Sequence, residues 1–94
     1  MKVVHKYSLQ PRSGRQSLLL PKGAEILAVG VQDDYNLQLW TLVDVMYAPE
    51  WVERTLLVYA TGEYQQEPVG KHLGTLLLQN GAYVLHVFEV PNVG

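Results

Sequence analysis

Hydrophobic and polar residues alternate with a period of two along most of this chain, a pattern that predicts half-buried β-strands. In residues 3–9, for example, Val3 and Tyr7 fall on one face and Lys6 falls on the other. Turns rich in Pro, Gly, Asp and Asn separate the alternating segments. Five strands are predicted before the C-terminal region: Val3–Leu9, Gln16–Leu20, Ala24–Gln32, Leu37–Val45 and Arg54–Thr61.

The strongest local signal is the C-terminal segment Leu73–Val90, in which Asn80-Gly81 separates two strand-like runs. Because an Asn-Gly pair tolerates positive φ at both central positions of a type I′ turn, we expect a β-hairpin. Counting outward from this turn predicts the cross-strand pairs Gln79–Ala82, Leu78–Tyr83, Leu77–Val84, Leu76–Leu85, Thr75–His86, Gly74–Val87 and Leu73–Phe88. Both faces of the hairpin are apolar. One can cover the core, and the other needs a second layer or another molecule.

These seven strand candidates, joined by short turns, predict an all-β protein with one domain over residues 1–94. Strands that follow each other are expected to pair, which gives an antiparallel meander folded into a small sandwich or open barrel. The chain has no cysteine, so its 94 residues must rely on a single modest apolar core. Lys2 and Lys6 are typical of a first strand that protects a sheet edge, and Gly30 indicates a bulge or a close approach by another backbone.

Charge is distributed unevenly along the chain. Residues 1–22 carry five basic residues and no acid, whereas residues 23–94 carry nine acids and only Arg54 and Lys71 as basic residues. We expect the early strands to lie against acidic later segments, so that the charges offset one another; a basic partner-binding edge is the alternative. The net charge of −2 argues against a nucleic-acid-binding protein.

Neither a signal peptide nor a membrane span is expected. His5 and Lys6 interrupt the first apolar stretch, unlike the apolar core of a signal peptide. No run approaches the roughly 20 apolar residues that cross a bilayer. A cytoplasmic protein is therefore expected.

The sequence carries no recognisable catalytic or metal-binding motif. His5, His72 and His86 are not spaced like zinc ligands. His86 points where apolar residues point, which favours a structural, half-buried histidine opposite Thr75. The serines lack the strained glycine-flanked turn of a catalytic nucleophile. We therefore expect a protein that is not an enzyme and has no cofactor or metal.

Large aromatic residues are better candidates for function, because they are common anchors of protein interfaces. The alternative for Trp40 and Trp51 is that they close the ends of a small core. Arg54 either pairs with a nearby acid, Glu53 or Asp44, or binds a carboxylate or phosphate. The residues that we expect to bind a partner or ligand are Trp40, Tyr47, Trp51, Arg54, Thr61 and Tyr64.

Four segments carry more specific patterns. In order they are LPKGAEIL at Leu20–Leu27, LW.LVD at Leu39–Asp44, the pair Thr61-Gly62, and LHVFE at Leu85–Glu89. Together they resemble a family of small uncharacterised proteins of tailed phages and prophages, although the loop after Asp44 and residues 62–70 depart from it. The resemblance implies a phage origin and action inside a bacterial host, in the cytoplasm. It implies no reaction.

The leading hypothesis is a non-enzymatic phage accessory protein that binds a host protein, such as an inhibitor of a bacterial defence system of the CRISPR-Cas type. One alternative is a homo-oligomer that sequesters a small nucleotide-like signalling ligand, with Arg54, Thr61 and Trp51 near a pocket. Another alternative is a minor virion component. We also expect a homodimer formed through an apolar face or an edge of the sheet.

Overall fold

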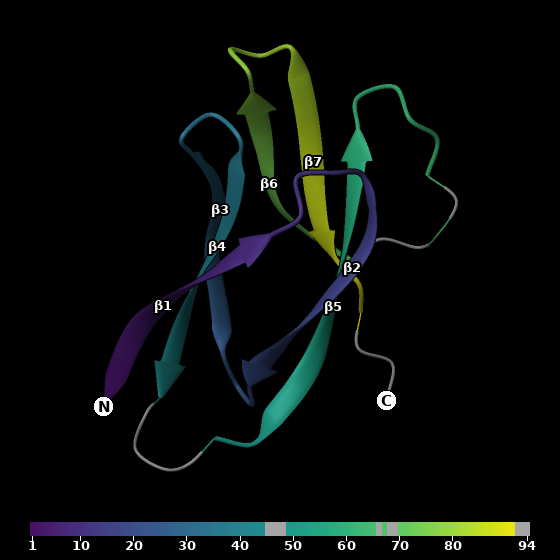
Figure 1. The fold of residues 1–94 in the computed structure, drawn as a ribbon. Coiled ribbons are helices and arrows are strands. Elements are labelled where there is room, and N and C mark those ends of the chain that lie inside the picture. Colours follow the sequence, from purple (N-terminus) through teal and green to yellow (C-terminus); the bar gives the residue numbers. More distant parts are fainter. Residues whose placement is uncertain (45–48, 66, 68–69, 92–94) are drawn as a thin grey trace.

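The computed structural model describes residues 1–44, 49–65, 67 and 70–91, and it confirms the all-β prediction. Each strand pairs with its neighbours in the antiparallel sense (Figure 1). The seven strands are β1 (Lys2–Leu9), β2 (Gly14–Pro21), β3 (Glu25–Gln32), β4 (Asn36–Asp44), β5 (Trp51–Ala60), β6 (Lys71–Leu78) and β7 (Tyr83–Glu89).

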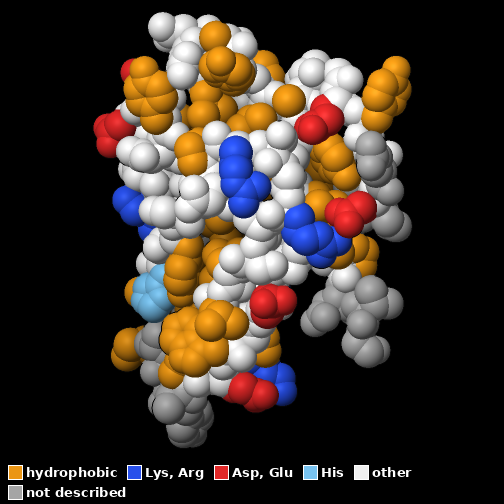
Figure 2. Space-filling model, turned by 45° about the vertical axis from the view of Figure 1, so that its right-hand side comes forward, with side chains coloured by type: hydrophobic (Ala, Val, Ile, Leu, Met, Phe, Trp, Pro, Cys, Tyr) orange, Lys and Arg blue, Asp and Glu red, His pale blue; other side chains and the backbone are white. Residues whose placement is uncertain are grey.

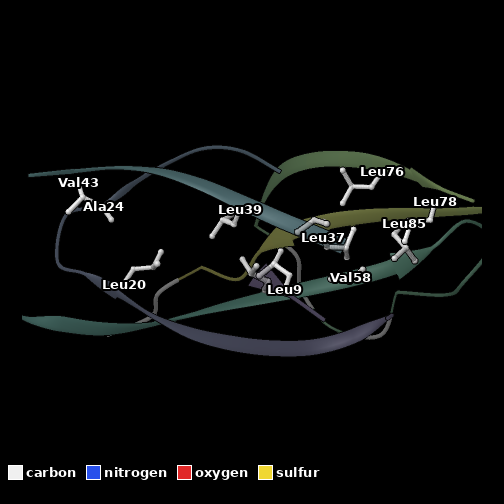
Figure 3. Packing of buried hydrophobic residues seen from close by; sticks show 12 residues of the cluster. Leu9, Leu20, Ala24, Leu37, Leu39, Val43, Val58, Leu76, Leu78 and Leu85 are labelled. Atoms are coloured by element: carbon white, nitrogen blue, oxygen red, sulfur yellow. The ribbon is translucent and has the colours of Figure 1, made fainter. Parts of the chain in front are cut away.

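The strands form two sheets, which pack as a sandwich. One sheet has the order β1-β4-β3 and the other has the order β2-β5-β7-β6. Buried aliphatic side chains from both sheets meet between them, as Figure 3 shows for Leu37 and Leu39 above Leu20 and Val58. Of the two predicted architectures, the sandwich is therefore the one that forms.

The predicted meander is wrong, because most strands that follow each other in the sequence do not pair with each other. Sequence neighbours pair at β3–β4 and β6–β7, whereas β1 pairs with β4, β2 with β5, and β5 with β7. The connections after β1, β2 and β4 each carry the chain from one sheet to the other. Alternating between the sheets lets both layers turn an apolar face toward the same core.

The C-terminal hairpin has the predicted pairs from Leu78–Tyr83 to Gly74–Val87. At its turn, the Ala82 amide donates to the Gln79 carbonyl over 3.1 Å. The strand ends differ from the prediction, because a register shift between His72 and Gly74 places His72, and not Leu73, opposite Phe88. A bulge of this kind adds one residue to one strand and offsets the pairs on its far side by one position.

The close approach at Gly30 is made by a side chain, and not by another backbone as predicted. A Cβ atom on Gly30 would lie 2.9 Å from Cζ3 of Trp40, so the indole lies against the glycine on the adjacent strand. The bulge of β3 is elsewhere, between Ile26 and Ala28. Glycine at this position lets a large ring lie flat on the sheet.

Two of the five early basic residues, Arg15 and Lys22, lie beside later acids, which supports in part the prediction that the charges offset one another. Arg15 forms an ion pair with Glu67 at 2.9 Å, and Lys22 lies 3.6 Å from Glu50. The strand β1 is an edge of its sheet, as its lysines predicted.

Candidate binding face of the four-stranded sheet

The four-stranded sheet has an inner side that belongs to the core and an outer side that faces away from it. In β6, the outward Leu77 lies between the core residues Leu76 and Leu78 and is 63% exposed, whereas those two are about 5% exposed. Side chains alternate between the two sides of a strand, so the same separation runs across β5, β6 and β7. We call the following outward residues the outer face: Tyr59, Thr61, His72, Thr75, Leu77, Val84, His86 and Phe88.

A chain of side-chain hydrogen bonds crosses the outer face. His86 contacts Thr61 Oγ1 through Nε2 at 2.8 Å and Thr75 Oγ1 through Nδ1 at 3.0 Å. Thr75 Oγ1 also lies 3.1 Å from His72 Nε2. Each ring nitrogen of His86 thus has a threonine hydroxyl as its hydrogen-bond partner, and a hydroxyl can either donate or accept. These bonds hold the imidazole of His86 in one orientation between two strands.

Aromatic rings lie next to this chain of hydrogen bonds. The ring of Phe88 packs edge-on against Tyr59, with centroids 6.2 Å apart, and it lies at a tilt against the ring of His72, with centroids 5.1 Å apart. Such ring pairs contribute about 1 kcal/mol beyond the area that they bury. The result is a surface of rings and aliphatic groups with fixed hydrogen-bonding groups among them.

A groove of about 570 Å³ borders the outer face on the β2 side. Its lining includes Tyr59, Tyr64, Glu63 and the Arg15–Glu67 ion pair. The two carboxylates outnumber the single guanidinium, so the groove is mildly acidic. Figure 2 shows hydrophobic side chains reaching the surface among charged ones, near the top and the bottom of the molecule.

Two of the predicted binding residues belong to this region. Thr61 is part of the hydrogen-bonded chain, and Tyr64 lines the groove with 88% of its surface exposed. Trp51 does not lie in a connection as predicted, because it is the first residue of β5, and it is 53% exposed. It precedes Thr61 by ten residues, or about 33 Å of extended strand. Tyr47 lies outside the described residues.

Arg54 lies on the inner side of the sheet, and its acidic partner differs from those proposed. Its Nε and Nη2 donate to the two carboxylate oxygens of Glu89 on β7, and Nη1 donates to the Ala24 carbonyl over 2.9 Å. Glu53 is not that partner, since it alternates to the opposite side of β5. Asp44 is not that partner either, since it ends β4 in the other sheet, where it lies 3.4 Å from the N-terminal ammonium. Arg54 therefore ties β5 to β7 and to the connection before β3.

Trp40 lies on the other sheet, on the side of β4 opposite the core residues Leu39 and Thr41. The tertiary structure thus separates Trp40, Arg54, Thr61 and Trp51. The pocket that was expected around Arg54, Thr61 and Trp51 does not form, because these residues lie at different ends and on different sides of the sheet.

The sequence prediction missed Tyr59, His72 and Phe88 as members of a surface. The signal was present in the apolar character of both hairpin faces and in the pair Thr75–His86, which β6 and β7 form as predicted. His86 does lie opposite Thr75 and is half-buried, as expected. His72 is exposed, and its ring packs against Phe88.

Comparison with known proteins gives a family without a known activity. The family described as Domain of unknown function (DUF7352) matches residues 1–94. The chain belongs to this family. No curated protein and no solved structure matches the chain. Membership in the family therefore assigns no function to the chain.

Among the residues that the structure describes, no group of three or more His, Cys, Asp or Glu side chains is arranged to hold a metal ion. None of the described segments forms a helix that is long and apolar enough to cross a membrane.

Proposed function

We propose that this protein works by binding another protein, and that the outer face of the four-stranded sheet makes the contact. The observation that carries this proposal is the position of exposed Leu77 and the rings of Tyr59, His72 and Phe88 on the side of the hairpin opposite the core. Interfaces draw most of their binding energy from a few aromatic and aliphatic side chains that lose water on contact.

The fixed geometry of the face favours this role. Because the bonds from His86 to Thr61 and Thr75 already hold its ring, binding a partner costs little side-chain entropy there. The sheet backbone beneath is paired on both sides of β7. A partner would therefore meet a preformed surface.

The partner that we propose is a host protein. The resemblance to proteins of tailed phages implies a phage accessory protein that acts in the cytoplasm of a bacterium, and an inhibitor of a defence system such as CRISPR-Cas fits that setting. A non-enzymatic inhibitor needs only a surface that occupies its target. The exposed hairpin supplies such a surface.

Two variants with matched exposure test the face. Leu77→Asp places a charge on it, whereas Leu19→Asp places the same charge on β2 of the same sheet, where Leu19 is 58% exposed. We expect a partner recovered from host lysate by the wild-type protein to bind Leu77→Asp at least about tenfold more weakly, or by 1.4 kcal/mol. Leu19→Asp should retain the partner. Full binding by Leu77→Asp would contradict the proposal.

A homodimer remains part of the proposal, with the outer face or a sheet edge as its contact. Leu77→Asp tests for the dimer. Leu76→Asp cannot serve, because Leu76 is 5% exposed in the core and a charge there would unfold the protein. Light scattering should give about twice the monomer mass of 10.6 kDa for the wild type. Monomeric wild-type protein at micromolar concentration would refute the dimer.

The second candidate function is binding of a small nucleotide-like ligand. Arg54, Thr61 and Trp51, which were expected to form its pocket, lie apart. Basic side chains gather at another cavity, however, and this observation favours a negatively charged ligand.

A further inference from the structure

A cavity of about 530 Å³ lies where the turn between β2 and β3, the strand β5 and the end of β7 meet. Its charged lining consists of Lys22, Arg54, Lys71 and Glu89. Val52, Val90 and Pro91 contribute apolar wall. We call this site the cationic cavity; it is separate from the outer face.

The concentration of positive charge is unusual for this chain. Three of its seven basic residues line the cavity, and after Lys22 the sequence contains only two basic residues, Arg54 and Lys71, both of which lie here. The single lining carboxylate, Glu89, is paired with Arg54. Two lysine charges remain in a protein whose net charge is −2.

Glu50 also approaches the site, and Glu53 lines the adjoining depression beside Arg54. Glu50 lies 3.6 Å from the ammonium of Lys22, and both side chains are about 70% exposed. An exposed ion pair of this kind contributes at most about 1 kcal/mol, so an anionic ligand can displace it. The ammonium of Lys22 is therefore available to a ligand that carries more charge than one carboxylate.

Defined backbone contacts hold the basic residues in place. Gly23 has φ of 81° in the turn after Lys22, and the Lys22 amide donates to the Glu50 carbonyl over 2.7 Å. A Cβ atom on Gly70 would lie 2.2 Å from the Glu89 carbonyl oxygen, so only glycine lets the chain before Lys71 run this close to β7. The lysines thus start from positioned backbone at the rim of the cavity.

Arg54 supplies the floor. Its guanidinium is bound to Glu89 and to the Ala24 carbonyl, and its side chain is 19% exposed. This arrangement adds no net charge, but it fixes the shape of the cavity between β5 and β7.

We propose that the cationic cavity binds a small phosphate-bearing molecule of about nucleotide size. The phosphate lies between the ammonium groups of Lys22 and Lys71, and the remainder of the ligand packs on Val52, Val90 and Pro91. Lysine is a common phosphate ligand, and two lysines match the double charge of a phosphate monoester. The volume falls within the range of about 300–1,000 Å³ of small-molecule sites.

Calorimetry at low salt tests the proposal with AMP, cyclic di-AMP and ribose 5-phosphate, and with adenosine as the uncharged control. At least one phosphate compound should bind with Kd below about 1 mM, a binding free energy of about −4 kcal/mol. Adenosine should bind at least tenfold more weakly, since the lysines contribute only to the phosphate contact. No binding of any phosphate compound, or equal binding of adenosine, would overturn the proposal.

Two double variants with equal charge change locate the site. Lys22→Gln with Lys71→Gln should weaken binding of the phosphate compound about tenfold or more, whereas Lys2→Gln with Lys6→Gln on β1 should leave it within about twofold. Equal losses would show a long-range charge effect and overturn the assignment. Leu77→Asp should bind the phosphate compound normally, which separates this site from the proposed protein-binding face.

Discussion

Replacing Gly74 on β6 by alanine should weaken the contact between the two sheets. The φ angle of Gly74 lies outside the left-handed region, so the backbone itself accepts alanine. In a strand this change would otherwise stabilise the protein by about 0.5–1 kcal/mol. Here a Cβ atom would lie 2.5 Å from Cγ2 of Val29 on β3, in the other sheet. Overpacking of this kind costs about 1–3 kcal/mol, so we expect a net destabilisation of about 1 kcal/mol.

Removing the opposing methyl groups should relieve the clash. Val29→Ala alone loses about 1 kcal/mol, because about two carbon atoms of a half-buried side chain are deleted. In the double variant, the new methyl group of residue 74 occupies the space that Val29 vacates. The double variant should then lose only about 0.5 kcal/mol, instead of the additive 2 kcal/mol, a coupling of about 1.5 kcal/mol.

Urea unfolding followed by the fluorescence of Trp40 and Trp51 measures these values. With an m value of about 1 kcal/mol/M, each single variant should lower the unfolding midpoint by about 1 M. Val31→Ala is the matched control, because Val31 is another half-buried valine packed on the core from β3. Its effect should add to that of Gly74→Ala. Coupling below about 0.5 kcal/mol with Val29, or the same coupling with Val31, would refute the packing of β3 against β6.

Two further predictions concern the interior. Thr41 is fully buried on β4, and its Oγ1 has no hydrogen-bond partner among the described residues. Thr41→Val should therefore raise the free energy of unfolding by about 1 kcal/mol and the melting temperature by about 5 °C. A lower melting temperature in calorimetry would count against this. Arg54→Met leaves the carboxylate of Glu89 without its guanidinium, and since both side chains are about 20% exposed we expect a loss of about 2 kcal/mol in urea unfolding. Adding Glu89→Leu should restore part of that loss, and no restoration would argue against the ion pair as its cause.

Much of the local structure could be predicted from the sequence, because it depends on residues close together in the chain. Alternation places each of the seven strands to within a few residues, and Asn80-Gly81 predicts the pairs of the C-terminal hairpin as far as Gly74–Val87. Among the predicted strand bounds, the start of β5 differed most from the structure. Trp51, Val52 and Glu53 pair with β2, whose contribution to that sheet the sequence did not reveal.

The candidate sites were harder to predict, because each gathers residues from distant segments. The contact between Arg54 and Glu89 joins residues 35 positions apart. The cationic cavity requires Lys22, Arg54 and Lys71 to meet, and their separate positions in the sequence carry no signal that they do. The outer face could be predicted in part, since Thr75 and His86 belong to the predicted hairpin.

The sequence by itself determined the all-β class, the strands and a hairpin with two apolar faces, since these follow from side-chain alternation and turn preferences within short segments. Only the tertiary structure decided which strands pair across the sandwich and which hairpin face is buried. Leu76 became core and Leu77 became surface because the three-stranded sheet covers one side of the hairpin. Which face is buried and which strands pair depend on long-range packing, in which two layers share one core. The positions of both proposed binding sites follow from this packing.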